Sequence, residues 1–493
     1  MSERYFGPTF EWSGRRFLFD RRPVPILLLS RSLRLVAILL LIGVFLGGAF
    51  EIPAPVGLEP AAWRTLWIFG LAVVLWLFQP IPLSITGLLI FALIPLTQIL
   101  DARTAYAAFG NRVVFFILGA FILAGVLMSS GLSTRLTLLT LTKVGNRPRR
   151  LIATIYLLGA VFSCLMSEHA VAAMLFPLVL EIAMALGLKP GESRYGKALF
   201  LSLSWGCIVG GSLTILGGGR GPLAIGILEE FTQKAETIHF LEFSLINLPT
   251  VAVMMIVGWI LLNAIFSKDL PDLAPAEKIL RERLIHLGRL TFREGAIGVV
   301  MILTILSWIF TGEDFGLANI AILSTVVLFV LNLTTWREIE HSVNWGIILM
   351  YGGAICLGAA LDQTGAARWV AQRTLGSLGN PYLLMTVFAA ASLILTAFMS
   401  NSAVIAVLTP IALSMSSQLG IDLKAATMVI VLTSNLDFTL PMGTPATAIA
   451  YSSGYIRMKD NLFWGLIMVG CGFGAVILMQ FFYWPFLGLA IGR

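Results

Sequence analysis

Four ionisable residues lie within otherwise apolar stretches of this sequence. Glu168 and His169 are adjacent, Arg220 lies in a glycine-rich interruption, and Asp437 lies six residues before Gly443. An isolated charge inside a membrane is costly, so such residues usually pair with one another or line a pathway. Glu168 and Arg220 are therefore natural partners, either as a structural ion pair or within a binding site. Asp437 could make a polar contact between helices, or it could tune the binding of a cation or proton.

These residues adjoin interruptions in apolar segments. The run Gly217-Gly218-Gly219-Arg220-Gly221-Pro222 interrupts segment 198–228, and Pro441-Met442-Gly443-Thr444-Pro445 interrupts segment 424–455. No continuous helix favours such sequences. A broken helix within a membrane exposes backbone carbonyl groups to a cation, and its N-termini offer N–H groups and a positive dipole end to an anion. The breaks therefore predict a site that can hold both signs of charge.

The composition predicts that these segments lie in a lipid bilayer. Hydrophobic residues make up 58% of the 493 residues and charged residues only 12%, whereas soluble chains carry about 25% charged residues. The apolar runs are near the roughly 20 residues that a spanning helix needs, and they lack the two-residue alternation of a membrane barrel. Basic residues flank these runs, so the net charge of +7 indicates membrane topology and not nucleic-acid binding.

The expected fold is an all-α polytopic membrane protein with about 11 transmembrane helices and two re-entrant hairpins. The N-terminal tail lacks a convincing cleavable signal, so we expect it to remain in the cytoplasm and the C-terminus to lie outside. The expected spans are 33–50, 64–80, 82–100, 113–131, 246–266, 294–311, 316–334, 343–361 and 461–490, with hairpins at 151–187 and 381–418 and broken helices at 198–228 and 424–455.

Two halves of the chain repeat the same pattern. The matched pairs, each 233 positions apart, are Ser163 and Thr396, Ser167 and Ser400, and Pro177 and Pro410. An odd number of crossings in each repeat places the second copy upside down, which predicts an inverted repeat whose hairpins enter from opposite faces.

Several of these motifs resemble the divalent anion/sodium symporter family of di- and tricarboxylate carriers. Ser400-Asn401-Ser402 would form a hairpin tip, Leu440-Pro441-Met442-Gly443-Thr444-Pro445 follows in a broken helix, and Asn344-Trp345-Gly346 leads into Tyr351-Gly352-Gly353. The resemblance covers nearly the whole chain. It implies a homodimeric, elevator-type carrier in the inner (plasma) membrane, with a small anion as substrate, sodium as the coupling ion and no organic cofactor.

The same resemblance implies a division of the chain and a set of site residues. The divisions would be 1–150 for the tail and first scaffold helices, 151–267 for the first hairpin, broken helix and following span, 268–380 for the connector and second scaffold helices, and 381–493 for the second hairpin, broken helix and last span. Sodium would bind at Thr396, Ser400, Asn401 and Gly443, and in the first half at Ser163, Ser167, position 168 and Gly217. Substrate contacts would come from Asn401, Ser402, Thr444 and Pro445, and from Glu168, His169, Gly218 and Arg220.

The first half departs from the family pattern. Ser167-Glu168-His169 stands where Ser-Asn-Thr is expected, and Gly218-Gly219-Arg220-Gly221 stands where Ser-Pro-Pro-Asn is expected. Either the Arg220 guanidinium or a transported proton on Glu168 or His169 could replace sodium there, and a carboxylate could equally bind sodium.

Other functional classes remain as alternatives or are excluded. A membrane enzyme would need a metal or acid–base cluster at one membrane face, and the sequence has no HExxH motif or acidic cluster. The stretch Gly191–Lys197 has the spacing of a phosphate-binding loop, but Ala198 replaces the required Ser or Thr. A cation/proton antiporter of related fold and an anion exchanger remain open, and the sequence does not identify the anion.

Overall fold

The computed structural model describes residues 10–12, 15–17, 24–266, 270–375, 380–440, 443–489 and 491. Pro441 and Met442 of the second predicted break, Lys268 at the start of the connector, and the basic tail residues Arg21 and Arg22 lie outside the described residues. The described residues confirm the all-helical membrane fold, apart from a small antiparallel hairpin that pairs β1 (Phe10–Trp12) with β2 (Arg15–Phe17).

The helices fall into two runs that follow the predicted repeat. After α1 (Val24–Glu51), the first run comprises α2 (Pro60–Phe78), α3 (Leu83–Leu96), α4 (Ala102–Ala107), η1 (Ala108–Gly110), α5 (Arg112–Ser129), α6 (Leu132–Leu141), α7 (Pro148–Ser163), α8 (Glu168–Ala185), α9 (Arg194–Gly210), η2 (Ile215–Gly217), α10 (Arg220–Phe231) and α11 (Phe240–Phe266). After α12 (Ala274–His286), the second run comprises α13 (Phe292–Phe310), α14 (Gly312–Phe315), α15 (Leu317–Val330), α16 (Trp336–Ile339), α17 (Trp345–Gln363), α18 (Ala366–Leu375), α19 (Pro381–Thr396), α20 (Asn401–Leu419), α21 (Leu423–Ser434), α22 (Pro445–Ser452), α23 (Met458–Phe482) and η3 (Trp484–Leu487).

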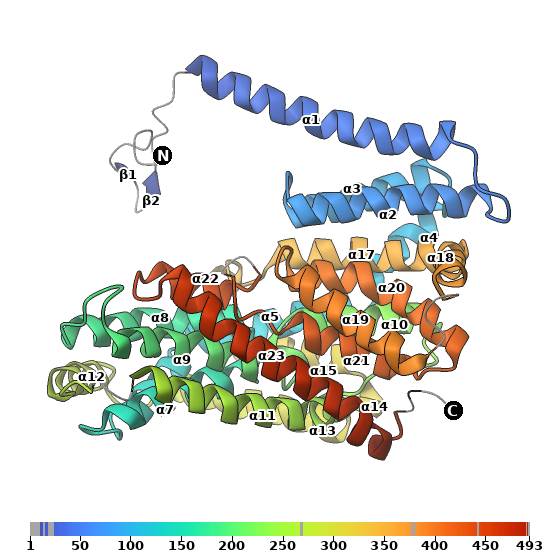
Figure 1. The fold of residues 1–493 in the computed structure, drawn as a ribbon. Helices are drawn as coiled ribbons and strands as arrows, with labels where there is room; N and C mark the ends of the chain where they lie inside the picture. The colour runs from blue at the N-terminus through green and yellow to red at the C-terminus, as the bar shows by residue number, and fades with distance from the viewer. Residues whose placement is uncertain are drawn as a thin grey trace.

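The helix boundaries confirm the duplication. Helices α5, α7 and α8 begin at residues 112, 148 and 168, and α17, α19 and α20 begin at 345, 381 and 401, so each pair is 233 positions apart. The hairpin of α7 and α8 lies toward the end of the molecule that carries α12, and the hairpin of α19 and α20 lies toward the opposite end, near the C-terminal segment (Figure 1). This arrangement is that of an inverted repeat.

The two halves interlock through their central helices. Helix α5 of the first half packs on α15 of the second, and α17 of the second half packs on α3 of the first. Close approach explains some of the glycines, because a Cβ on Gly87 would lie 2.9 Å from the Cα of Met350 in α17. Small residues allow such helix contacts in membranes, where apolar burial gives no net driving force.

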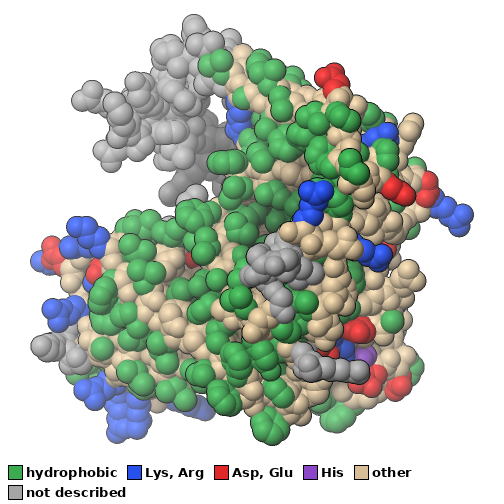
Figure 2. Space-filling model, turned by 45° about the vertical axis from the view of Figure 1, so that its right-hand side comes forward, with side chains coloured by type: hydrophobic (Ala, Val, Ile, Leu, Met, Phe, Trp, Pro, Cys, Tyr) green, Lys and Arg blue, Asp and Glu red, His purple; other side chains and the backbone are tan. Residues whose placement is uncertain are grey.

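Nine helices within the described residues are long and apolar enough to cross a membrane, and shorter apolar helices cover 83–96, 317–330, 381–396 and 423–434. The count of 11 crossings plus two hairpins remains a prediction. Figure 2 shows hydrophobic side chains over the middle of one face, with charged side chains gathered toward its ends. That distribution suits a protein surrounded by lipid.

The polar connector between the halves contains a helix, α12, which we did not expect from the sequence. Leu273, Ala276 and Leu280 are buried along one side of it, at a spacing that places them on one helical face. Arg283 forms an ion pair of 2.7 Å with Glu181 of α8. These contacts fix the connector against the first hairpin.

Candidate binding site at the helix breaks

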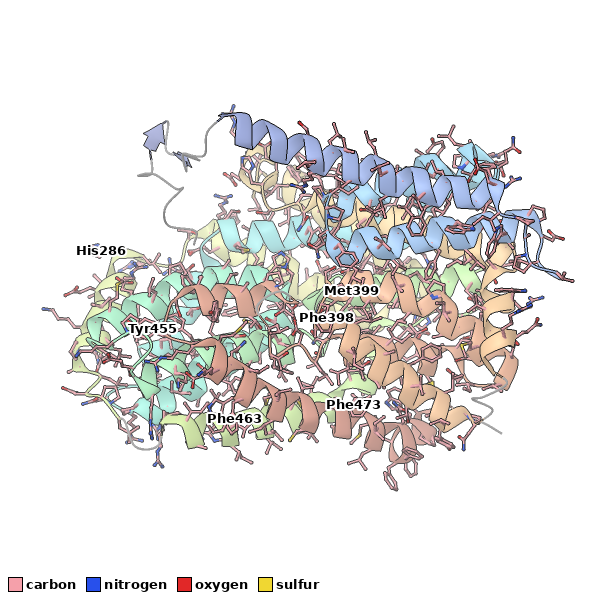
Figure 3. All side chains as sticks on the ribbon, turned by 45° about the horizontal axis from the view of Figure 1, so that its top comes forward. His286, Phe398, Met399, Tyr455, Phe463 and Phe473 are labelled. Atoms are coloured by element: carbon pink, nitrogen blue, oxygen red, sulfur yellow. The ribbon has the colours of Figure 1, made fainter. Side chains whose placement is uncertain are left out.

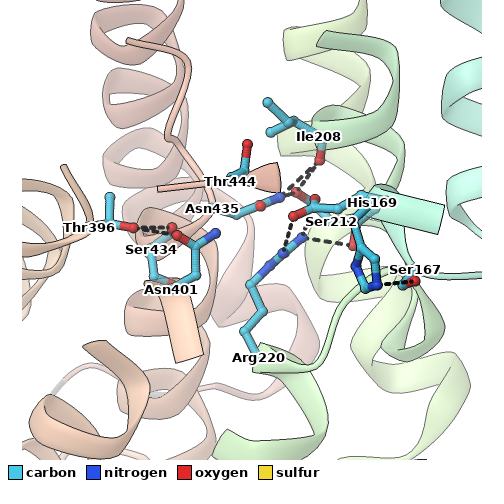
Figure 4. A network of polar contacts seen from close by, with 12 residues as sticks. Ser167, His169, Ile208, Ser212, Arg220, Thr396, Asn401, Ser434, Asn435 and Thr444 are labelled. Atoms are coloured by element: carbon cyan, nitrogen blue, oxygen red, sulfur yellow. Dashed lines mark hydrogen bonds and ion pairs between the residues drawn. The ribbon is translucent and has the colours of Figure 1, made fainter. Parts of the chain in front are cut away.

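Four helices begin where the two hairpins and the two broken segments meet. Helix α8 begins at Glu168, α20 at Asn401, α10 at Arg220 and α22 at Pro445. Helix α10 packs on α20, and α22 packs on α8, so the helix that follows each break packs on the hairpin of the other half. Arg220 lies between the tip that carries Asn401 and the tip that carries His169 (Figure 4). Helix N-termini carry unpaired N–H groups and a positive dipole end, so their convergence favours an anion.

Glu168 and Arg220 form the ion pair that the sequence suggested. Arg220 Nη1 donates to Glu168 Oε1 at 3.2 Å, and Nη2 donates to Oε2 at 3.3 Å and to the Gly211 carbonyl at 3.1 Å. Each residue is only 5% exposed. The two-pronged contact holds the guanidinium in one orientation and makes the pair neutral overall.

The other first-half residues surround this pair. Ser167 Oγ lies 3.4 Å from His169 Nε2, and the buried Ser163 side chain faces Cys207 of α9. Gly217 packs closely on Gly211, because a Cβ on Gly217 would lie 2.6 Å from the Gly211 carbonyl carbon. Gly218 has an extended backbone and lies against the Arg220 guanidinium. The structure therefore brings the first-half set together around Arg220.

The second hairpin tip has a different hydrogen-bond pattern. Thr396 Oγ1 lies 2.6 Å from Asn401 Oδ1 and 2.8 Å from the Ser434 carbonyl oxygen. Ser400 caps α20 by accepting a hydrogen bond from the Ala403 N–H at 3.3 Å. Because Asn401 Oδ1 is engaged with Thr396, its Nδ2 group is the part of the side chain that can donate to an anion. In the same hairpin tip Met399 is buried and Phe398 is exposed (Figure 3).

The second break starts α22 in a defined way. Thr444 Oγ1 accepts a hydrogen bond from the Thr447 N–H at 3.3 Å, and Pro445 occupies the first helical position. At the far end of α22, Tyr455 stacks on Phe200 with ring centroids 5.0 Å apart (Figure 3). The stack and a contact of 3.3 Å between Thr447 Oγ1 and Ser204 Oγ of α9 fix α22 on α9.

Asp437 lies directly against the second break. It is 1% exposed, no described side chain donates to its carboxylate, and the backbone N–H groups of Thr439, Leu440 and Thr444 face it. A Cβ on Gly443 would overlap the Asp437 carboxylate and lie 2.8 Å from the Thr396 carbonyl oxygen. The carboxylate and this carbonyl therefore converge on the glycine that the family resemblance assigned to sodium.

The sequence alone did not identify three side chains that complete this region. Asn435 donates from Nδ2 to the Ile208 carbonyl at 2.9 Å and also contacts Ser212 Oγ, which links α21 to α9. Tyr351 of α17 is fully buried, and its hydroxyl lies against Gly219. Asn435 could have been found as a polar residue in an apolar run, whereas nothing local marked the contacts of Ser212 or Tyr351.

Two small cavities adjoin the first break. One is lined by Ser167, Gly218 and Gly219 together with Phe116 and Ala120 of α5. The other lies between the halves and is lined by residues that include Ser212, Arg220 and Val431.

Residues 32–490 match the family model described as the sodium:sulfate symporter transmembrane region. The sodium-dependent dicarboxylate transporter SdcS of Staphylococcus saprophyticus is 26% identical over 478 residues, covering 90% of this chain and 91% of the relative. SdcS of Staphylococcus aureus strain MW2 is 25% identical, covering 87% of this chain and 86% of the relative.

Solved structures share the fold at lower sequence identity. The YdaH transporter of Alcanivorax borkumensis has a TM-score of 0.56 and 15% identity, covering 88% of this chain and 100% of that structure. MtrF of Neisseria gonorrhoeae also has a TM-score of 0.56 and 15% identity, covering 91% of this chain and 93% of that structure. The matched span and the helical membrane architecture together confirm the expected relationship: this chain is a membrane transporter that belongs to the sodium:sulfate symporter family, the divalent anion/sodium symporters.

Proposed function

We propose that this protein carries a small dianion, such as a C4 dicarboxylate, across the cell's inner (plasma) membrane, coupled to sodium. The observation that supports this most is the convergence of four helix N-termini from both halves around Arg220 and Asn401. The curated relatives are named as sodium-dependent dicarboxylate transporters, and the family description names sulfate, so both point to a doubly charged anion.

The proposed anion lies between the two hairpin tips. One side offers the Asn401 amide, the Ser402 hydroxyl and the start of α22, and the other offers His169 and the start of α10 beside Arg220. The proposed substrate residues are Glu168, His169, Gly218, Arg220, Asn401, Ser402, Thr444 and Pro445. The proposed sodium ligands are Thr396, Ser400, Asn401 and Gly443 of the second half, and the first-half residues Ser163, Ser167 and Gly217 would bind sodium only in a carrier that couples two ions per cycle.

In the proposed transport cycle, the regions that carry the breaks move relative to the rest of the protein. Regions 151–267 and 381–493 would form the moving part, and regions 1–150 and 268–380 would form a scaffold that pairs with a second copy. The contact of Tyr351 in α17 with Gly219 at the start of α10 joins these two parts. The N-terminus is placed in the cytoplasm and the C-terminus outside, because basic residues cluster on the proposed inner side.

Uptake into proteoliposomes tests the proposal. Labelled succinate and labelled sulfate are each supplied under an inward sodium gradient and under an equal potassium gradient. Sodium should stimulate uptake of at least one of the two dianions. Asn401→Ala should lower both the rate and the sodium dependence, while Asn319→Ala should leave both unchanged, because Asn319 is exposed and bonds only to a carbonyl of its neighbouring turn. Equal uptake in sodium and potassium would contradict sodium coupling, and unaltered transport by folded Asn401→Ala would remove that residue from the site.

Anion exchange is the second candidate, because the Glu168–Arg220 pair places a permanent cation where the family pattern expects sodium. Uptake into vesicles preloaded with unlabelled anion, in sodium-free buffer from pH 5 to 8, separates the two mechanisms. An exchanger would need the internal anion and would not need sodium. Proton release driven by a cation gradient without any anion would instead indicate a cation/proton antiporter.

A further inference from the structure

Each half carries one buried acid in this region, but at a different position of the repeat: Asp437 precedes the second break, and Glu168 lies at the first hairpin tip. Asp437 lies six residues before Gly443, and Gly211 lies six residues before Gly217, so Asp437 and Gly211 correspond. At the hairpin tips the acid is in the other half, because Glu168 corresponds to Asn401, 233 positions later.

The local geometry supports this correspondence. Gly217 packs against the backbone of Gly211, just as Gly443 packs against Asp437. In the first half the Glu168 carboxylate also approaches this point, since a Cβ on Gly211 would lie 3.1 Å from Oε2. Each half therefore places one carboxylate at this contact: Asp437 lies against Gly443, and Glu168 lies beside Gly211, on which Gly217 packs.

The two carboxylates differ in what neutralises them. Glu168 is paired with Arg220, whose guanidinium also donates a hydrogen bond to the Gly211 carbonyl oxygen. In the second half Ala446 stands 226 positions after Arg220, the same separation as between Gly217 and Gly443. No described side chain donates to the Asp437 carboxylate, which faces the backbone N–H groups of Thr439, Leu440 and Thr444 and has no cationic partner among the described residues. Glu168 acts on it across the site and is itself paired with Arg220.

We propose that Asp437 is the ligand for a single coupling cation, and that Arg220 permanently takes the place of a second one. A sodium-sized ion would bind between the Asp437 carboxylate, the Thr396 carbonyl and the turn at Gly443. A carboxylate without a countercharge in a membrane interior is costly, and a hard monovalent cation with oxygen ligands removes that cost. This inference rests on the proposed function for its coupling role, but the cation site itself can be tested without transport.

Thermal unfolding of the purified protein without any anion tests the site directly. Sodium chloride should raise the melting temperature of the wild type relative to choline chloride at equal ionic strength, because a bound ion stabilises only the folded state. Asp437→Asn should abolish this sodium-dependent rise. Asp362→Asn is the matched control, since Asp362 lies in α17 and is partly buried but lies outside the site, and its response to sodium should equal that of wild type.

Sodium-dependent uptake tests the coupling role. Asp437→Asn should raise the sodium concentration for half-maximal uptake at least tenfold, or abolish stimulation by sodium. The proposal is overturned if Asp437→Asn keeps the wild-type sodium dependence, or if wild-type unfolding does not respond to sodium. A sodium response in unfolding that Asp437→Asn loses, without any dianion uptake, would support the cation site while rejecting the proposed function.

A wild-type measurement keeps the proposal testable if Asp437→Asn does not fold. The ratio of ²²Na⁺ flux to labelled-anion flux in proteoliposomes should correspond to one coupled sodium ion per cycle. A ratio of two would mean that the first half also binds sodium, and it would overturn the role given to Arg220.

Discussion

A methyl group at Gly219 should disrupt the contact between α10 and α17. The backbone of Gly219 is ordinary, with φ −69° and ψ −17°, so alanine is conformationally acceptable there. The obstacle is steric, because a Cβ would overlap the Tyr351 hydroxyl and lie 2.9 Å from Tyr351 Cζ, whereas ordinary contacts begin near 3.4 Å. Overpacking of this kind costs about 1–3 kcal/mol.

Tyr351→Phe provides the matched test of this reasoning. It removes the hydroxyl, which also faces Ser402, and leaves only the milder overlap of about 0.5 Å with Cζ. Uptake rates and melting temperatures are measured for wild type, Gly219→Ala, Tyr351→Phe and the double variant. Gly219→Ala should slow uptake about 5- to 150-fold if the cost of about 1–3 kcal/mol falls on the transport cycle. The double variant should recover most of that loss.

Two outcomes would refute the steric explanation. One is a double variant as impaired as Gly219→Ala, and the other is a Gly219→Ala protein that transports and melts like wild type. Gly474→Ala is the control for glycine replacement in a helix, because a Cβ at Gly474 would meet nothing within 4 Å.

The remaining predictions concern two buried ion pairs. Glu168→Gln should lower the free energy of unfolding by about 3–5 kcal/mol, because it leaves the Arg220 charge buried and uncompensated. The double variant Glu168→Gln with Arg220→Gln should be more stable than Glu168→Gln alone. Chemical denaturation measures both, and strictly additive losses of stability would contradict the pairing. Arg135→Ala should lower stability by a similar amount, since Arg135 bonds to Glu294 at 2.9 Å and to the Gly288 carbonyl at 2.7 Å, with little change in sodium affinity. Arg135→Lys should also melt below the wild type, because lysine keeps the charge but lacks the planar, forked guanidinium group. A melting temperature equal to that of the wild type would contradict this.

Much of the fold could be predicted from the sequence because hydrophobic length and helix-breaking residues act locally. The expected spans and the observed helices agree closely, and the hairpin tips at Ser167 and Ser400 precede helix starts as expected. Helix α12 was missed because only Ala276 and Leu280 of the helix, and Leu273 just before it, are buried within an otherwise polar segment.

The site could be predicted only in part. The pairing of Glu168 with Arg220 followed from the cost of isolated charges in a membrane, a principle that needs no knowledge of the fold. The placement of Tyr351 against Gly219 depends on how α17 packs on α10, which is a contact between distant parts of the chain. Asn435 and Ser212 likewise meet only after both halves are in place.

The division of polar contacts between the halves has a consequence for biogenesis. The N-terminal half of a chain is synthesised first, so α8 and α10 can enter the membrane before α20 and α22 exist. Glu168 and Arg220 both belong to this early half, so the two charges can neutralise each other while the chain is still attached to the ribosome. The bond between Ser212 and Asn435 must wait for α21, which makes its formation a marker for completed assembly of the two halves.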